Sequence, residues 1–210
     1  MQPFYRVVNL HAALLEVCPR LHGPAFDVWF IPILIQVIIL IGLLEEHVGV
    51  NHRDLKGDNI LISKDSVQQS KESVLGSKTW NFTFRRSVHV VDFGFACRGT
   101  RTDMPASVSA GDFFTLTDVC PKQGRDIYIL LCYFWAQPHW RASASPKLLN
   151  FVRDFLRVQK IMDHLTTHGL SRTKYIYFLL SERDFPSKSC TPMAILEAIA
   201  TAWPALLGVH

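Results

Sequence analysis

The chain has 210 residues, of which 49% are apolar and 19% are charged, and its formal net charge is +4. This is the composition of a globular protein with one sizeable core, and it excludes a disordered or fibrous chain. The positive charge is small and no long run of Lys and Arg concentrates it, so nucleic-acid binding is not expected.

The five cysteines are scattered along the chain and are never spaced C-x-x-C. This usage predicts reduced thiols and a cytoplasmic or nuclear location, and it argues against a zinc ribbon or a disulfide framework. The first twenty residues contain charged side chains and lack a continuous apolar run, so we expect no secretory signal.

Residues 1–27 are the least informative segment. Within them, residues 9–18 place apolar side chains at helical spacing, and Pro19, Gly23 and Pro24 end the pattern. We therefore predict one short helix before the main body of the fold.

Residues 28–44 are almost wholly apolar, interrupted by Pro32, Gln36 and Gly42. At 17 residues, the stretch reaches the lower limit for a membrane span. A helix buried in a domain core is also apolar on every face, and a polar stretch follows this one within a few residues. We favour a buried helix and expect no membrane association, with a membrane tether as the alternative.

Residues 51–62 form the most informative stretch, N-H-R-D-L-K-G-D-N-I-L-I. Asp54 and Asn59 are five residues apart with Lys56 between them, a spacing that suits a tight loop rather than a helix face. Such a loop can direct a general base, a cation for phosphate and a metal ligand into one space. It then runs directly into an apolar strand.

The next residues, 63–77, are rich in Ser, Lys and Gln, and this composition predicts a solvated loop without a core of its own. Beyond it, Trp80, Phe82 and Phe84 alternate with polar residues, which predicts a strand.

An apolar strand predicted at residues 88–91 ends in D-F-G. In that order, residues 51–62 and this D-F-G resemble the catalytic loop (H-R-D-L-K-x-x-N) and the D-F-G turn of eukaryotic-type serine/threonine protein kinases. Residues 46–54 are also similar to the pattern L-H-x-x-G-V-x-H-R-D, through which the family's long buried helix leads into that loop.

The resemblance implies a fold that is mainly α with small β-hairpins (α+β), namely the large, C-terminal lobe of the kinase family, over residues 28–202. Residues 63–80 would then be an insertion, residues 1–27 an N-terminal segment and residues 203–210 a tail. The family's small lobe carries a G-x-G-x-x-G loop and the lysine of a V-A-I-K strand, and neither pattern occurs in this sequence. A partner chain that completes the nucleotide site is therefore one expectation.

The resemblance also implies roles for single residues, with ATP and Mg²⁺ as cofactors. Asp54 would accept the proton of a substrate hydroxyl, and Lys56 would neutralise charge on the transferring γ-phosphoryl group. Asn59 and Asp92 would hold Mg²⁺ against the ATP phosphates. A lysine two places after the base is typical of serine/threonine kinases.

Other residues would support this site. The resemblance gives His52, Arg53, Phe93 and Gly94 structural roles, and Arg53 would also meet a phosphate on the activation segment. Asp126 opens an apolar stretch similar to the family's central buried helix, D-x-Y/W-S-x-G. Its carboxylate would accept hydrogen bonds from the backbone of the catalytic loop.

The sequence departs from the family pattern after the D-F-G. Residues 94–123 take the place of the activation segment and hold many hydroxyls, but the A-P-E that ends that segment has only a partial counterpart at residues 104–107, without its glutamate. The small size, the insertion and this loss resemble divergent kinase-like proteins of large DNA viruses. If the chain is viral, its cytoplasmic location would be that of a host cell.

Two further helices are predicted from their caps. Ser145 followed by Pro146 starts one that Gly169 ends, and Thr191 starts a last one that runs to residue 202. His164 and His168 lie four residues apart on the first of these and would suit a metal pair. Without a third ligand in the pattern, surface or capping roles are favoured.

The sequence therefore predicts a serine/threonine protein kinase that transfers the ATP γ-phosphoryl group to a hydroxyl of a protein substrate. The alternative is a catalytically impaired kinase-like binding module, or a truncated kinase that lacks the nucleotide-binding small lobe. Phosphoryl transfer depends on positioning and electrostatics, so loss of the Gly-rich loop and its lysine should lower the rate by several orders of magnitude.

Overall fold

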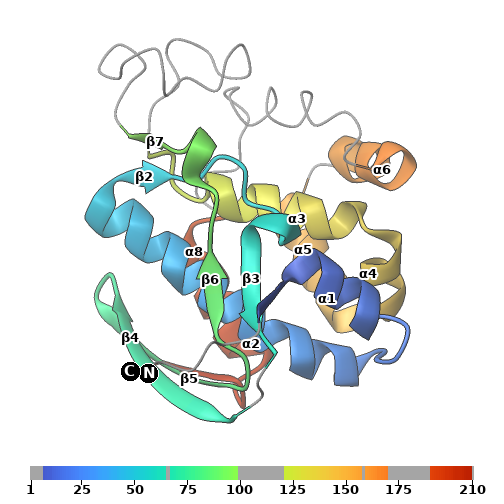
Figure 1. Ribbon diagram of the computed structural model, residues 1–210, viewed down its shortest axis with the longest axis horizontal. Helices are drawn as coiled ribbons and strands as arrows, with labels where there is room; N and C mark the ends of the chain where they lie inside the picture. The colour runs from blue at the N-terminus through green and yellow to red at the C-terminus, as the bar shows by residue number, and fades with distance from the viewer. Residues whose placement is uncertain (1–6, 65–66, 99–120, 158, 170–189, 210) are drawn as a thin grey trace.

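A computed structural model describes residues 7–64, 67–98, 121–157, 159–169 and 190–209 of the chain. Helices and small antiparallel sheets pack together, and the long helix α2 (Pro24–Leu43) runs through the middle of the molecule (Figure 1). The chain is thus a mixed α+β protein, as the sequence predicts.

Helix α2 begins with Pro24 at its first turn and continues into a π-helical turn, Leu44–Val48. Pro32 removes one backbone donor inside the helix, and the Gln36 side chain donates to the Pro32 carbonyl at 3.0 Å and to the Arg86 carbonyl at 2.9 Å. By length and composition the helix could span a membrane, yet 67% of its most apolar window is buried in the protein. Such burial is typical of a core helix.

The other helices pack against α2 or against one another. They are α1 (Leu10–Val17), α3 (Arg125–Ala136), α4 (Pro138–Ser143), α5 (Pro146–Leu156), α6 (Gln159–His168) and α8 (Pro192–Ala202). The predicted caps are confirmed: Ser145 Oγ accepts from the Leu148 N–H at 3.1 Å, and Thr191 Oγ1 accepts from the Ala194 N–H at 3.2 Å.

The prediction of one helix from Ser145 to Gly169 is wrong. Helix α5 ends at Leu156 because Arg157 adopts a left-handed conformation with φ of 51°, and α6 starts at Gln159. The side chain of Arg157 donates to the Asp154 carbonyl at 2.9 Å, which stabilises the break.

Small antiparallel sheets complete the described part of the chain. Strands β1 (Val7–Asn9), β3 (Ile60–Ser63) and β6 (Val88–Val90) form one sheet in the order β1-β3-β6, and β2 (Val50–Asn51) pairs with β7 (Cys97–Arg98). A further sheet has the order β4-β5-β8 and comprises β4 (Gln69–Leu75), β5 (Lys78–Phe84) and β8 (Leu207–Val209). All these pairings are antiparallel.

The β4–β5–β8 sheet corrects the prediction of a solvated loop at residues 63–77. Strand β4 pairs with β5 along its whole length, from Gln69 opposite Phe84 to Leu75 opposite Lys78. Most β4 side chains are exposed, so its sequence lacks the apolar alternation by which strands are recognised. The strand predicted around Trp80 is confirmed as β5, and the predicted tail contributes β8.

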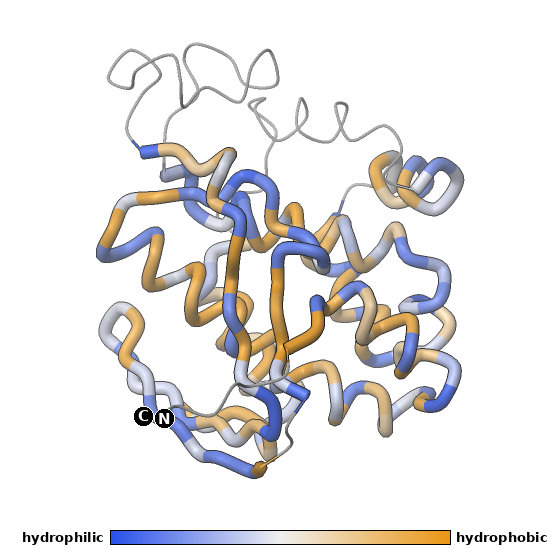
Figure 2. Tube along the Cα trace, viewed as in Figure 1, coloured by the Kyte–Doolittle hydropathy of each residue, from blue (hydrophilic) through white to orange (hydrophobic). Residues whose placement is uncertain are grey.

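The core joins α2, α3 and α4 through an aromatic cluster. The Phe30 ring lies 4.8 Å from that of Phe134 and 5.7 Å from that of Trp140, and all three side chains are buried. Figure 2 shows hydrophobic stretches along α2 and along β3 and β6, in the middle of the molecule. One polar loop lies between β2 and β3, and a second follows β6.

The four cysteines that the structure describes divide into two groups. Cys18, Cys132 and Cys190 are buried free thiols, whereas Cys97 forms a disulfide. The prediction of reduced thiols therefore holds for these three and is wrong for Cys97.

Phe30→Ala should lower the free energy of unfolding by about 3–5 kcal/mol, because it leaves a cavity beside two buried aromatic rings. Val28→Ala, on the same helix but with a side chain 61% exposed, should change it by less than about 0.5 kcal/mol. Urea denaturation of both variants measures the difference, and equal losses would contradict this packing.

Candidate functional site

Asp126, in the first turn of α3, fixes the backbone of the loop between β2 and β3. One carboxylate oxygen of Asp126 accepts from the His52 backbone N–H at 2.7 Å, and the other accepts from the Arg53 N–H at 2.7 Å. Asp126 is fully buried, and Arg53 has φ of 69°, a conformation that costs a non-glycine residue free energy. The two hydrogen bonds hold the loop backbone in this shape.

Three polar side chains meet at the outer end of the loop. Lys56 Nζ donates to Asp54 Oδ2 at 2.8 Å, and Asn59 Nδ2 donates to the same oxygen at 3.1 Å and to the Asp54 carbonyl at 2.8 Å. The Asp54 side chain is 15% exposed and that of Lys56 39% exposed. The structure thus brings a carboxylate, a cation and an amide together at the surface.

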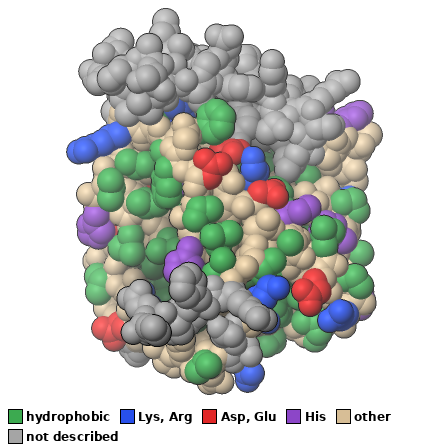
Figure 3. All heavy atoms as spheres, in the orientation of Figure 1, with side chains coloured by type: hydrophobic (Ala, Val, Ile, Leu, Met, Phe, Trp, Pro, Cys, Tyr) green, Lys and Arg blue, Asp and Glu red, His purple; other side chains and the backbone are tan. Residues whose placement is uncertain are grey.

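The second loop, after β6, lies next to the first. The Val91 N–H donates to the Asn59 carbonyl at 3.0 Å, so the backbone that leads into Asp92 runs beside Asn59. His52 Nε2 bonds the Val91 carbonyl at 2.8 Å, and this ring also contacts that of Phe93, with centroids 4.8 Å apart. Figure 3 shows acidic and basic side chains gathered on this face of the molecule.

Asp92 itself has φ of 63°, and its Oδ1 accepts from the Gly94 N–H at 3.4 Å. This bond turns the chain sharply after β6. The Phe93 side chain is 42% exposed. The two loops are therefore joined by a backbone hydrogen bond and by the His52 ring. Asp54 and Lys56 are partly exposed and Asp92 is exposed, whereas Asn59 is buried.

The donor set of Asn59 and Asp92 suits a hard divalent cation. Mg²⁺ is usually held by one or two protein oxygens together with water and phosphate oxygens. Among the residues that the structure describes, no three His, Cys, Asp or Glu side chains are close enough to hold a metal ion by themselves. The rings of His164 and His168 lie 4.9 Å apart on α6, and within the described part of the chain they belong to no such group of three.

Glu45 belongs to the site and is absent from the sequence prediction. It lies in the π-helical turn after α2 and accepts from Asn51 Nδ2 and from the Gly124 N–H, both at 3.1 Å. Asn51 Nδ2 also lies 3.3 Å from Asp126 Oδ2, and Asn51 Oδ1 accepts from the Lys122 N–H at 2.6 Å. A carboxyl group at the end of an apolar helix was the only sequence signal.

Burial dominates the electrostatics of this acid pair. Burial, and secondarily the nearby Asp126 carboxylate, raises the pKa of Glu45 to about 8. Burial also raises the pKa of Asp126, against the opposing effect of its bonds from the Arg53 and His52 backbone. Because Asp126 accepts two short backbone bonds, we assign it the negative charge and Glu45 the proton.

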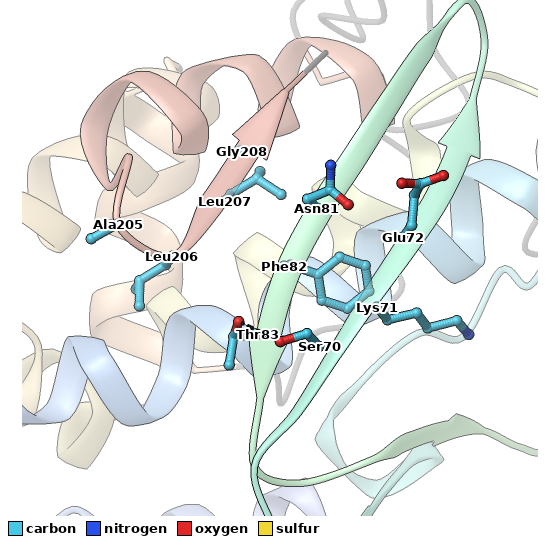
Figure 4. Close-up of a pocket in the computed structure, with 10 residues that line it drawn as sticks. All are labelled: Ser70, Lys71, Glu72, Asn81, Phe82, Thr83, Ala205, Leu206, Leu207 and Gly208. Carbon is cyan, nitrogen blue, oxygen red and sulfur yellow. Dashed lines mark hydrogen bonds between the residues drawn. The ribbon is translucent and has the colours of Figure 1, made fainter.

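One surface hollow adjoins the second loop, and another lies apart from both loops. The first is a groove of about 480 Å³, lined mainly by apolar side chains of α2, the π-helical turn and β6, together with Phe93. The other, of about 300 Å³, lies on the β4–β5–β8 sheet between residues 70–72, 81–83 and 205–208 (Figure 4). In it, Ser70 Oγ and Thr83 Oγ1 are 3.2 Å apart, and none of the predicted site residues lines it.

The predicted activation-segment hydroxyls at residues 100–117, and the counterpart of A-P-E, lie outside the described residues. No protein-family model, curated protein or solved structure matches the chain. Any functional assignment therefore depends on the geometry of the two loops.

Glu45→Gln should flatten the dependence of stability on pH. Between about pH 4.5 and 8, the unfolded chain ionises Glu45 while the folded chain keeps its proton, so the free energy of unfolding falls as pH rises, by at most about 1.4 kcal/mol per unit. A neutral amide does not titrate and can accept the same bond from Gly124. Urea denaturation across this pH range measures the slope.

Glu46→Gln is the matched control, because this neighbouring side chain is exposed and accepts from the Gly76 N–H at 2.9 Å. It should keep the slope of the parent protein. A Glu45→Gln variant with the parental slope would contradict the assignment of the proton.

Proposed function

We propose that the chain is a protein-kinase-like large lobe that transfers the γ-phosphoryl group of Mg²⁺-ATP to a serine or threonine hydroxyl of a protein substrate. The observation that carries the proposal is the convergence of Asp54, Lys56 and Asn59 beside the backbone of Asp92. A loop anchored by a buried aspartate, next to a second loop with D-F-G, supports the same interpretation.

The order of elements also supports it. A long buried helix leads into the loop, two short strands β3 and β6 join the loop to Asp92, and helix α3 opens with Asp126. This is the order that the kinase resemblance implies for a large lobe. The cytoplasmic location is part of the proposal, and the free thiols of Cys18, Cys132 and Cys190 are consistent with it.

Each side chain then has a defined task. Two donors, Lys56 and Asn59, hold the Asp54 carboxylate in one orientation, from which it can accept the proton of a substrate hydroxyl. The partly exposed Lys56 ammonium can also meet the negative charge of a phosphoryl group. Asn59 and Asp92 would hold Mg²⁺, which when bound neutralises charge on the ATP phosphates.

A second candidate is a kinase-like module that acts only with a partner chain, or that binds without catalysis. The apolar groove beside Phe93 favours it, because lining residues Val48 and Phe93 remain 46% and 42% exposed. A partner seated there would lie directly beside Asp92. Such a chain could supply the phosphate-binding loop and lysine whose patterns are missing from this sequence.

Asp54→Asn should lower phosphoryl transfer by about 10²- to 10⁴-fold, because the general base is lost, while Mg²⁺-ATP affinity stays close to that of the parent. Radiolabelled ATP with a generic protein substrate measures transfer. Asp154→Asn removes the same charge from the exposed face of α5 and should leave transfer unchanged. Equal transfer by the parent and Asp54→Asn would exclude a kinase mechanism at this loop.

Calorimetry with Mg²⁺-ATP separates the two candidates. The first predicts binding that Asp92→Asn weakens at least about tenfold, because one of two protein ligands of the ion loses its charge. Absence of both binding and transfer in the isolated chain would favour the second candidate.

A further inference from the structure

The 3₁₀ turn that carries Asn59 rests on a tyrosine of α3. The turn begins at Gly57, where an added Cβ would lie 2.5 Å from the Tyr133 Oη and 2.9 Å from two carbons of its ring. Real Cβ atoms do not approach other atoms this closely, so only glycine fits here without moving the ring. The hydroxyl end of Tyr133 is thus in direct contact with the catalytic-loop backbone.

Tyr133 is in turn fixed by α1. Its Oη lies 2.7 Å from His11 Nδ1, and the two rings meet edge to face with centroids 6.3 Å apart. Helix α1 is held in place by its Asn9 cap and by the pairing of Asn9 with Leu61 of β3, the strand that leaves the turn. A closed path therefore runs from the turn through Tyr133 and His11 and back to β3.

The surroundings keep the Tyr133 hydroxyl protonated. Burial, and secondarily the nearby Asp58 carboxylate, raises the pKa of Tyr133, so the phenol retains the proton that it can donate to His11. The ring of His139, on α4, lies 6.2 Å from that of His11, and burial followed by His11 lowers the pKa of His139. Asp58 and His11 are thus titratable neighbours of Tyr133, and His139 lies on the far side of His11 as a neighbour of that ring.

We propose that Tyr133 and His11 are positioning residues that hold the turn Gly57–Asn59, and through it the Asn59 side chain against Asp54. The turn is closed by the Asn59 N–H, which donates to the Lys56 carbonyl at 3.0 Å, so displacement of Gly57 displaces Asn59. Asp126 fixes the first half of the loop, and Tyr133 supports the second half from the same helix. The consequence for Mg²⁺-ATP rests on the proposed function; the support of the turn does not.

Tyr133→Phe tests the inference, because it removes the hydroxyl and keeps the ring. Hydrogen exchange of the Asn59 and Ile60 amides, measured by NMR, should become about fivefold faster, as the loss of one hydrogen bond allows the turn to open locally. Tyr128→Phe is the matched control, since its hydroxyl donates to the Leu156 carbonyl at 3.2 Å elsewhere on α3. It should leave exchange of these two amides unchanged. Equal acceleration in the two variants, or none in Tyr133→Phe, would overturn the inference.

Substitutions of His11 give an independent check. His11→Leu should accelerate the same amides to the same extent, and the double variant with Tyr133→Phe should be no faster, because both remove one shared bond. His11→Asn places an amide oxygen near the position of Nδ1 and should restore much of the protection. Additive effects of Tyr133→Phe and His11→Leu would show that the two side chains act separately, and would overturn the inference that they act through one shared bond.

Mg²⁺-ATP affinity and turnover of the same variants distinguish this inference from the proposed function. If the parent binds Mg²⁺-ATP, Tyr133→Phe should weaken the binding about fivefold while Tyr128→Phe does not, and equal affinities would overturn the positioning of Asn59. If the parent neither binds nor transfers, the proposed function fails. The hydrogen-exchange data then test by themselves whether Tyr133 and His11 support the turn.

Discussion

The two hydrogen bonds from the His52 and Arg53 backbone to Asp126 are the interaction on which the site depends. They tie a strained loop, with Arg53 at positive φ, to the buried first turn of α3. Charge-assisted bonds to a carboxylate are stronger than neutral ones, and removal of the acceptor would leave two donors without it in a buried place. The partly exposed side chains of Asp54 and Lys56, and the buried Asn59 side chain that bonds Asp54, take their positions from this anchor.

A second carboxyl group makes the anchor unusual. Glu45 reaches the same region from the π-helical end of α2, and both carboxyls bond Asn51. Burial raises the pKa of both carboxyl groups, and the charge of Asp126 raises that of Glu45 further, which is the basis for assigning the proton to Glu45. Hydrogen-bonded polar groups thereby connect α2, β2 and α3 at this junction. The loop is held both by Glu45 at the end of α2 and by Asp126 in α3.

The exposed side of the site is built differently from its buried side. Asp54 and Lys56 are partly exposed, and an apolar groove continues from Phe93 along α2 and β6. A polar site beside an exposed apolar groove is the arrangement expected of a surface that binds a partner protein. The proposed kinase activity and the proposed need for a partner chain are therefore compatible. The residues that the proposal assigns to one side of a nucleotide are present, whereas the sequence patterns of a phosphate-binding loop and its lysine do not occur.

The sequence by itself determined the polar loop, the apolar strands β3 and β6 that follow it, the caps of α5 and α8 and the long apolar helix, because each depends on spacing or on neighbouring residues. It could not identify β4, whose exposed strand is held by backbone pairing with β5, or the break at Arg157. Only the tertiary structure decided that Glu45 shares a buried junction with Asp126 and that Tyr133 supports Gly57. Those contacts join residues distant in the chain, and no local pattern encodes them.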